Sequence, residues 1–170
     1  MNEKKYRLTV ADLLSILETW DRSLSGPVLI VAFGGTALSL NGYKDSTKDA
    51  DFLVPLTKDY ETLLSLLKKK NYQQSSGNGW ISAENLWIFQ LYKGNQFFVT
   101  EFLDPVHLEG NHKVIQKFKR LTLACLNAED LIISKMFRGD QVDVDDCIAI
   151  IKKENLCLES LGSRYKETAG

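Results

Sequence analysis

Hydrophobic positions along the chain form two kinds of pattern. Continuous apolar runs occur at residues 28–32 and 121–126, which is typical of buried strands. Apolar residues recur at helical spacing in residues 10–20 and 57–70, and again after residue 127. Strand and helix patterns therefore alternate early, and helices dominate late. We predict an α/β or α+β domain, with a mixed sheet flanked by helices and a C-terminal helical part.

Local signals set the ends of several helices. Thr9 is a favourable N-cap for residues 10–20, and Asn127 is one for the helix that follows it. Further helices are expected at residues 142–153 and 158–170. The first is amphipathic, and the second ends in a polar segment that is expected to fray.

The middle of the chain predicts a β-hairpin. Residues 86–92 and 97–103 are strand-like, and Gly94-Asn95 between them favours a tight turn. Residues 72–84 are polar and have a centre rich in serine and glycine, so we expect a loop at a hairpin or a mobile flap there.

The strongest candidate chemistry begins directly after the first buried strand. Phe33 is followed by Gly34-Gly35, which allow a sharp turn and leave backbone N–H groups uncovered. A short helix pattern then begins at Thr36. A glycine turn that leads into a helix N-terminus is suited to bind phosphate.

Two carboxylates lie on the next predicted strand. Asp49 and Asp51 are two residues apart, which places them on one face with Cα atoms roughly 6–7 Å apart. Ala50 and Phe52 then point into the core. Two carboxylates beside an anion site can hold Mg²⁺ while the glycine turn holds a phosphate chain. An Asp-x-Asp pair alone is more often a solvated strand end, so the prediction depends on both features together.

This arrangement resembles a known signature. The order Gly34-Gly35, thirteen residues, then Asp49-Ala-Asp51 followed by Phe-Leu-Val is similar to the motif of the nucleotidyltransferase superfamily, which includes polymerase β-like enzymes and aminoglycoside nucleotidyltransferases. The stretch GYKDSTKDADFLV is most similar to small proteins related to AbiEii-type toxins. The resemblance implies a nucleotidyltransferase fold and transfer of a nucleoside monophosphate from an NTP to an acceptor hydroxyl. The acceptor would be tRNA, a protein or a small molecule.

The resemblance also implies roles for individual residues in that reaction. Asp49 and Asp51 would hold two Mg²⁺ ions, and Glu101 would complete the metal site as the third acid on a neighbouring strand. An acid in a strand of aromatic and β-branched residues is unusual, because burial of a lone carboxylate is costly. The nucleotide-binding residues would be Gly34, Gly35 and Thr36 at the β- and γ-phosphates, with Lys135 and Arg138 at the departing pyrophosphate.

Several alternatives remain open. Glu101 fits an exposed strand position equally well, and Lys135, Arg138, Asp143 and Asp146 could instead form salt bridges between two helices. The chain could be a non-enzymatic binding or regulatory partner with the same fold. It could also be the toxin of a toxin–antitoxin pair, with an antitoxin as its partner.

Composition limits the class of protein. The 170 residues suffice for a single domain over residues 1–170, with an α/β core to about residue 125 and a helical part over 126–170. The net charge of −1 gives no global case for nucleic-acid binding. The three cysteines are odd in number and lack zinc spacing, which predicts reduced thiols and a cytoplasmic protein. No apolar run is long enough to span a membrane.

Overall fold

The computed structural model describes residues 7–84, 87–97, 100–102 and 105–169. For residues 97, 100–101, 137–138 and 168–169 it describes the backbone alone.

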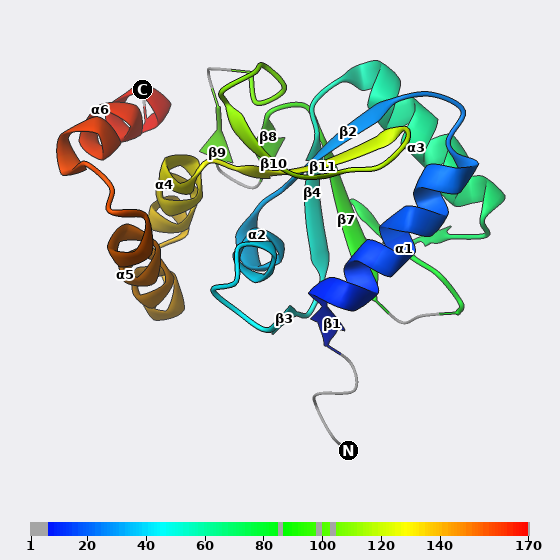
Figure 1. Ribbon diagram of the computed structural model, residues 1–170, viewed down its shortest axis with the longest axis horizontal. Helices are drawn as coiled ribbons and strands as arrows, with labels where there is room; N and C mark the ends of the chain where they lie inside the picture. Colours follow the sequence, from blue (N-terminus) through cyan, green and yellow to red (C-terminus); the bar gives the residue numbers. More distant parts are fainter. Residues whose placement is uncertain (1–6, 85–86, 98–99, 103–104, 170) are drawn as a thin grey trace.

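The centre of the fold is a seven-stranded mixed sheet with the order β10-β11-β2-β4-β7-β6-β5 (Figure 1). Pairing is parallel between β11 and β2 and between β4 and β7, and antiparallel elsewhere. The predicted mixed sheet is therefore confirmed. The strands of this sheet are β2 (Val28–Ala32), β4 (Ala50–Val54), β5 (Gln73–Gln74), β6 (Gly79–Ile81), β7 (Ile88–Lys93), β10 (His112–Lys117) and β11 (Leu121–Leu126).

Two small ribbons lie outside the main sheet. In one, β1 (Leu8–Thr9) pairs with β3 (Ser46–Thr47), and in the other β8 (Gln96–Phe97) pairs with β9 (Thr100–Glu101). The first ribbon fixes the loop that leads into β4.

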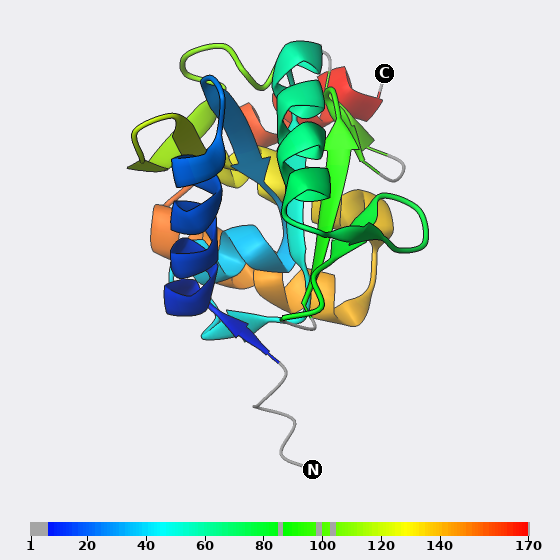
Figure 2. The same cartoon turned by 90° about the vertical axis from the view of Figure 1, so that its right-hand side faces the viewer.

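Helices cover both sides of the sheet. Figures 1 and 2 show α1 and α3 together on one side, and the three C-terminal helices on the other. The short helix α2 contacts β3, β4, β11 and α4, so it lies between the sheet and the C-terminal helices. The helices are α1 (Val10–Ser23), α2 (Gly34–Leu40), α3 (Thr57–Lys69), α4 (Ala128–Arg138), α5 (Gln141–Glu154) and α6 (Leu158–Ala169).

The core between α1 and the sheet is aromatic. Trp20 is fully buried, and its ring centroid lies 4.9 Å from that of Phe89 on β7. Its indole N–H donates to the Tyr72 hydroxyl at 3.2 Å, which satisfies the buried polar group. Trp80 is also buried, which places it in the core.

The helix boundaries follow the sequence signals closely. Thr9 accepts a hydrogen bond from the Asp12 N–H, as expected for the N-cap of α1. Gly139 ends α4 at φ 76°, a left-handed conformation that glycine adopts without strain. Asp140 and Asp143 then form a reciprocal capping box that begins α5.

The middle of the chain differs from the prediction in two ways. Residues 86–92 and 97–103 do not form one hairpin, because among the described residues β7 pairs with β4 and β6, and β8 pairs with β9. No strand was predicted at residues 112–117, which form the edge strand β10. An edge strand exposes much of its surface, so its sequence lacks the apolar pattern of an inner strand.

The three cysteines differ in burial. Cys125 and Cys147 are buried and free, whereas Cys157 is free and exposed. Burial raises the pKa of the Cys125 thiol to about 12, so it is inert as a nucleophile. In the described part of the chain, none of the helices is both long and apolar enough to cross a membrane.

A buried carboxylate joins the first helix to the last strand. Asp21, near the end of α1, accepts hydrogen bonds from the N–H groups of Lys119, Arg120 and Leu121 at 3.3, 2.6 and 2.8 Å. Burial by itself would raise the pKa of Asp21, but the three N–H donors outweigh burial and lower it. The charged form is therefore the one that the fold stabilises.

We expect Asp21→Asn to lower the free energy of unfolding by about 2–3 kcal/mol at neutral pH, because charge-assisted hydrogen bonds are lost. The depressed pKa stabilises the fold above the ordinary value of about 4, and this stabilisation is lost as the pH falls through the folded value. Urea unfolding from pH 7 to pH 3 should show the difference between wild type and variant shrinking. Glu18→Gln, on the exposed face of α1, is the control. Equal losses of stability in Asp21→Asn and Glu18→Gln would contradict the stabilising role of the Asp21 hydrogen bonds.

Candidate active site

The turn after β2 is fixed against the start of β4. The Phe33 N–H donates to the Asp51 carbonyl at 3.2 Å, which continues the pairing of the two strands. Gly34 follows at φ 57°, and a Cβ placed on it would lie 3.6 Å from Asp51 Oδ2. The left-handed turn at Gly34 thus brings the first turn of α2 beside the Asp51 carboxylate.

Gly35 has a packing role as well as a backbone one. A Cβ on Gly35 would lie 3.0 Å from Thr47 Oγ1, closer than real Cβ contacts normally come. A side chain at Gly35 would require Thr47 to move by a few tenths of an ångström, so glycine permits the close approach of α2 to β3.

Thr36 connects the helix to the carboxylate strand. Its side chain is fully buried, and its hydroxyl donates to the Asp49 carbonyl at 3.1 Å and accepts from the Asp51 N–H at 2.8 Å. The hydroxyl bonds β4 on both sides of Ala50, so it positions the two acids. A contribution of Thr36 to phosphate binding would have to come from its backbone N–H.

Asp49 and Asp51 alternate with core residues as predicted. Ala50 and Phe52 are fully buried, whereas the two aspartates are half-buried. Burial raises the pKa of Asp49, and the nearby charge of Lys48 opposes this increase. A partly desolvated carboxylate of this kind would gain from a neighbouring cation.

Two side chains beside Asp51 were missed in the sequence. Gln90 on β7 is the direct cross-strand partner of Asp51, and Tyr92 lies two residues further on. Burial raises the pKa of Tyr92, the charge of Asp51 adds to this, and a hydrogen bond with the Asn78 side chain opposes it. The Tyr92 ring also lies 5.5 Å from that of Phe33, at the entrance to the glycine turn. The only available sequence signal was that residues 86–92 form a strand, because the pairing partner of a strand is not encoded locally.

Glu101 lies on β9, which pairs with β8 and is not a strand of the main sheet. The expectation that its strand borders the Asp49–Asp51 strand was therefore wrong, since the neighbours of β4 are β2 and β7. The Glu101 side chain lies outside the described residues, so its role as the third acid stays a prediction. Among the described side chains, no three His, Cys, Asp or Glu groups converge as a metal site.

Lys135 lies in a buried ion-pair cluster between two helices. Its Nζ is 3.4 Å from Asp143 Oδ1 and 2.9 Å from Asp146 Oδ2, and the Lys135 side chain is 5% exposed. Lys44, in the loop after α2, reaches Asp146 Oδ2 at 3.3 Å. The alternative interpretation of these residues as inter-helix salt bridges agrees with this geometry. The Arg138 side chain lies outside the described residues.

The donor set of the site suits a hard divalent cation. Asp51 lies on β4 and Asp49 directly precedes it, both half-buried on either side of the buried Ala50, and carboxylate oxygens are ligands that Mg²⁺ prefers. Burial raises the pKa of Asp49 more than the charge of Lys48 lowers it, so a bound cation would favour the charged carboxylate. These two residues therefore fit a magnesium site, with further ligands supplied by a nucleotide and water.

Comparison with known proteins identifies the family of the chain. The model of a family described as nucleotidyltransferase of unknown function (DUF6036) matches residues 10–169. The chain belongs to this nucleotidyltransferase family. No curated protein sequence matches it.

Two solved structures share the fold of this DUF6036 protein. One is the crystal structure of ANT(2″)-Ia in complex with adenylyl-2″-tobramycin, with a TM-score of 0.58 and 11% identity over 92% of this chain and 95% of that one. The other is a putative nucleotidyltransferase (TM1012) from Thermotoga maritima, with a TM-score of 0.51 and 15% identity over 89% of this chain and 98% of that one. At these identities the comparison establishes the nucleotidyltransferase fold.

We expect Asp49→Asn to leave the apo protein as stable as wild type or more stable at pH 7. The pKa of Asp49 is raised in the folded state, so its charged form opposes folding above that pKa, and the effect disappears below the ordinary value of about 4. Melting temperatures at pH 7 and pH 3 measure this difference, with Asp45→Asn in the exposed loop as the control. A clear loss of stability at pH 7 would contradict it.

Proposed function

We propose that this DUF6036 protein transfers a nucleoside monophosphate from an NTP to an acceptor hydroxyl and releases pyrophosphate. The main support is the joint position of the glycine turn and the acidic strand, which Thr36 holds together through two hydrogen bonds. Gly34 lies against Asp51, so a phosphate chain on the turn would lie beside the acids.

The residues that would hold the nucleotide come from two segments. Backbone N–H groups of Gly34, Gly35 and Thr36 would donate to the β- and γ-phosphate oxygens. Asp49 and Asp51 would hold two Mg²⁺ ions, with Glu101 as the proposed third carboxylate. When bound, Mg²⁺ offsets the negative charge of the phosphates and orients them for attack.

In the proposed reaction the acceptor oxygen bonds to the α-phosphorus, and the bond from that phosphorus to the bridging oxygen breaks. The electron pair leaves with pyrophosphate, and the acceptor proton passes to the Glu101 carboxylate. Tyr92 and Gln90 flank Asp51 on β7, where they would orient the substrate and limit access of water.

Lys135 and Arg138 are proposed to offset charge on the departing pyrophosphate. Lys135 could do so only if its ammonium is shared between the phosphates and the carboxylates of Asp143 and Asp146. The burial of Lys135 favours a structural role instead, in which its ammonium positions α5 and the loop that carries Lys44.

The acceptor is proposed to be tRNA, a protein or a small molecule. The ANT(2″)-Ia structure holds an adenylylated small molecule, and because the fold is shared this supports a small-molecule acceptor. The similarity of the motif to AbiEii-related proteins supports a toxin role with an antitoxin partner. A non-enzymatic binding role is the second candidate, and the location of Glu101 outside the main sheet favours it.

We expect Asp51→Asn to weaken Mg²⁺-dependent NTP binding by about tenfold or more, because a charged metal ligand becomes neutral. Isothermal titration with NTP, with and without Mg²⁺, measures the loss. Asp45→Asn changes the same charge in the exposed preceding loop and should bind as wild type does. Equal affinities of Asp51→Asn and Asp45→Asn would overturn the metal role of Asp51.

Glu101→Gln should separate binding from turnover. If Glu101 accepts the acceptor proton, the variant binds NTP and Mg²⁺ but releases pyrophosphate at least about a hundredfold more slowly. The assay is pyrophosphate release in the presence of tRNA, protein or small-molecule acceptors. Wild-type rates in Glu101→Gln would exclude the third-acid role, and binding of NTP by a wild-type protein with no turnover on any acceptor would favour the non-enzymatic role.

A further inference from the structure

Gln90 on β7 lies directly beside the acidic strand. β7 pairs in parallel with β4, and Asp51 and Gln90 are Cα partners on these two neighbouring strands, which lie roughly 4.8 Å apart (Figure 1). Partner residues in a sheet point to the same face, and both of these side chains are half-buried. The amide of Gln90 and the carboxylate of Asp51 therefore share one face of the sheet.

The charge of Asp51 acts on this face of β7. Burial and then the charge of Asp51 raise the pKa of Tyr92, which lies two residues after Gln90 and therefore on the same face of the strand. On its other side, Asp51 Oδ2 lies 3.6 Å from the position that a Cβ of Gly34 would take. A cation bound to Asp51 would thus lie between the glycine turn and the face of β7 that carries Gln90.

The other strand neighbours of Asp51 and Gln90 offer no competing ligand. Across β7, Gln90 pairs with Gly79 of β6, which has no side chain. Across β4, the Asp51 carbonyl accepts from the N–H of Phe33, whose side chain is apolar and buried. Of the two residues directly opposite Asp51 on the flanking strands, Gln90 is the one with an oxygen in its side chain.

The amide of Gln90 is available to a ligand. Among the residues that the structure describes, none forms a hydrogen bond with the Gln90 side chain. A half-buried amide without a protein partner is costly unless water or a ligand binds it. Carbonyl oxygens, like carboxylate and water oxygens, are suitable ligands for Mg²⁺ and Mn²⁺. The position and the chemistry of this amide therefore both suit a metal ligand.

We propose that the side-chain carbonyl oxygen of Gln90 is a ligand of the divalent cation at Asp51. The proposal rests on the metal site of the proposed function and adds a protein ligand to that site. Gln90 occupies the place on a strand next to β4 where a third acid was expected. It supplies an oxygen there without a negative charge, so Asp49, Asp51 and Gln90 together carry two negative charges.

Binding of Mn²⁺ alone to the full chain tests the proposal, with the free ion measured by electron paramagnetic resonance. Gln90→Met keeps the length of the side chain but replaces the amide by a thioether, which is a poor ligand for Mn²⁺. This variant should bind Mn²⁺ about tenfold more weakly or worse, and so should Asp51→Asn. Equal affinities of wild type and Gln90→Met would overturn the proposal, as would a wild type that binds no Mn²⁺.

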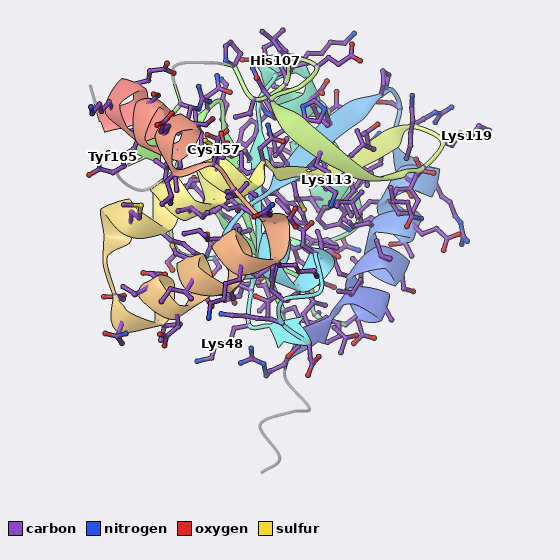
Figure 3. The ribbon with its side chains drawn as sticks, turned by 60° about the vertical axis from the view of Figure 1, so that its left-hand side comes forward. Lys48, His107, Lys113, Lys119, Cys157 and Tyr165 are labelled. Carbon is purple, nitrogen blue, oxygen red and sulfur yellow. The ribbon has the colours of Figure 1, made fainter. Side chains whose placement is uncertain are left out.

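The opposite change should strengthen the site. Gln90→Glu places a carboxylate at the same position and should tighten Mn²⁺ binding about tenfold or more, because the charge of the ligands sets the affinity. Gln116→Glu is the matched control, since Gln116 is exposed on β10, which β11 and β2 separate from β4. Figure 3 shows Lys113 of β10 well apart from Lys48, the residue before Asp49. Equal gains in both glutamate variants would show a general effect of charge and overturn the ligand role.

These measurements separate the ligand role from the proposed function, because they require no turnover. Mn²⁺ binding that depends on Asp51 but not on Gln90 excludes Gln90 as a ligand and leaves the proposed nucleotide transfer in place. Mn²⁺ binding that depends on both residues, in a protein that transfers no nucleotide, supports the ligand role and contradicts the transferase function. Circular dichroism confirms that each variant is folded.

Discussion

The candidate site depends on one buried hydroxyl. Thr36 Oγ1 donates to the Asp49 carbonyl and accepts from the Asp51 N–H, so a single side chain holds the glycine turn to the acidic strand. Neither bond uses the carboxylates, which remain directed away from the core formed by Ala50 and Phe52. In a buried setting, a hydroxyl that both donates and accepts has few alternatives, because each unmade bond is costly. The relative position of turn and acids is therefore rigid before any ligand arrives, which is the condition for preorganised binding.

The parts of the fold that the sequence predicts well are those that depend on local residue patterns. The apolar run at 28–32, the alternation around Asp49 and Asp51 and the Thr9 cap of α1 could all be predicted directly, since each depends on neighbouring residues. The pairing of β7 with β4 could not, because register between distant strands is a property of the whole sheet. For this reason Gln90 and Tyr92 were missed, and Glu101 was expected on a strand that does not border β4.

Charged residues at helical spacing are also ambiguous in the sequence, because the same spacing fits exposed and buried ion pairs. Lys135, Asp143 and Asp146 have the spacing of a solvent-exposed network, yet the Lys135 and Asp143 side chains are 5% and 1% exposed. A buried lysine needs nearby acids, so this cluster orders α4 and α5 relative to each other and, through Lys44, to the loop before the acidic strand. The C-terminal helices are thereby coupled to the segment that carries Asp49.

The position of β11 has a consequence for synthesis of the chain. β2 lies between β4 and β11, and Val28 pairs in parallel with Leu121. Asp21 likewise binds N–H groups of residues 119–121. On the ribosome, the strand that leads into the glycine turn therefore emerges long before one of its two neighbours. Until Leu126 has left the exit tunnel, β2 has an open edge and α1 lacks its anchor, so the nascent chain carries an unprotected hydrophobic strand through most of its elongation.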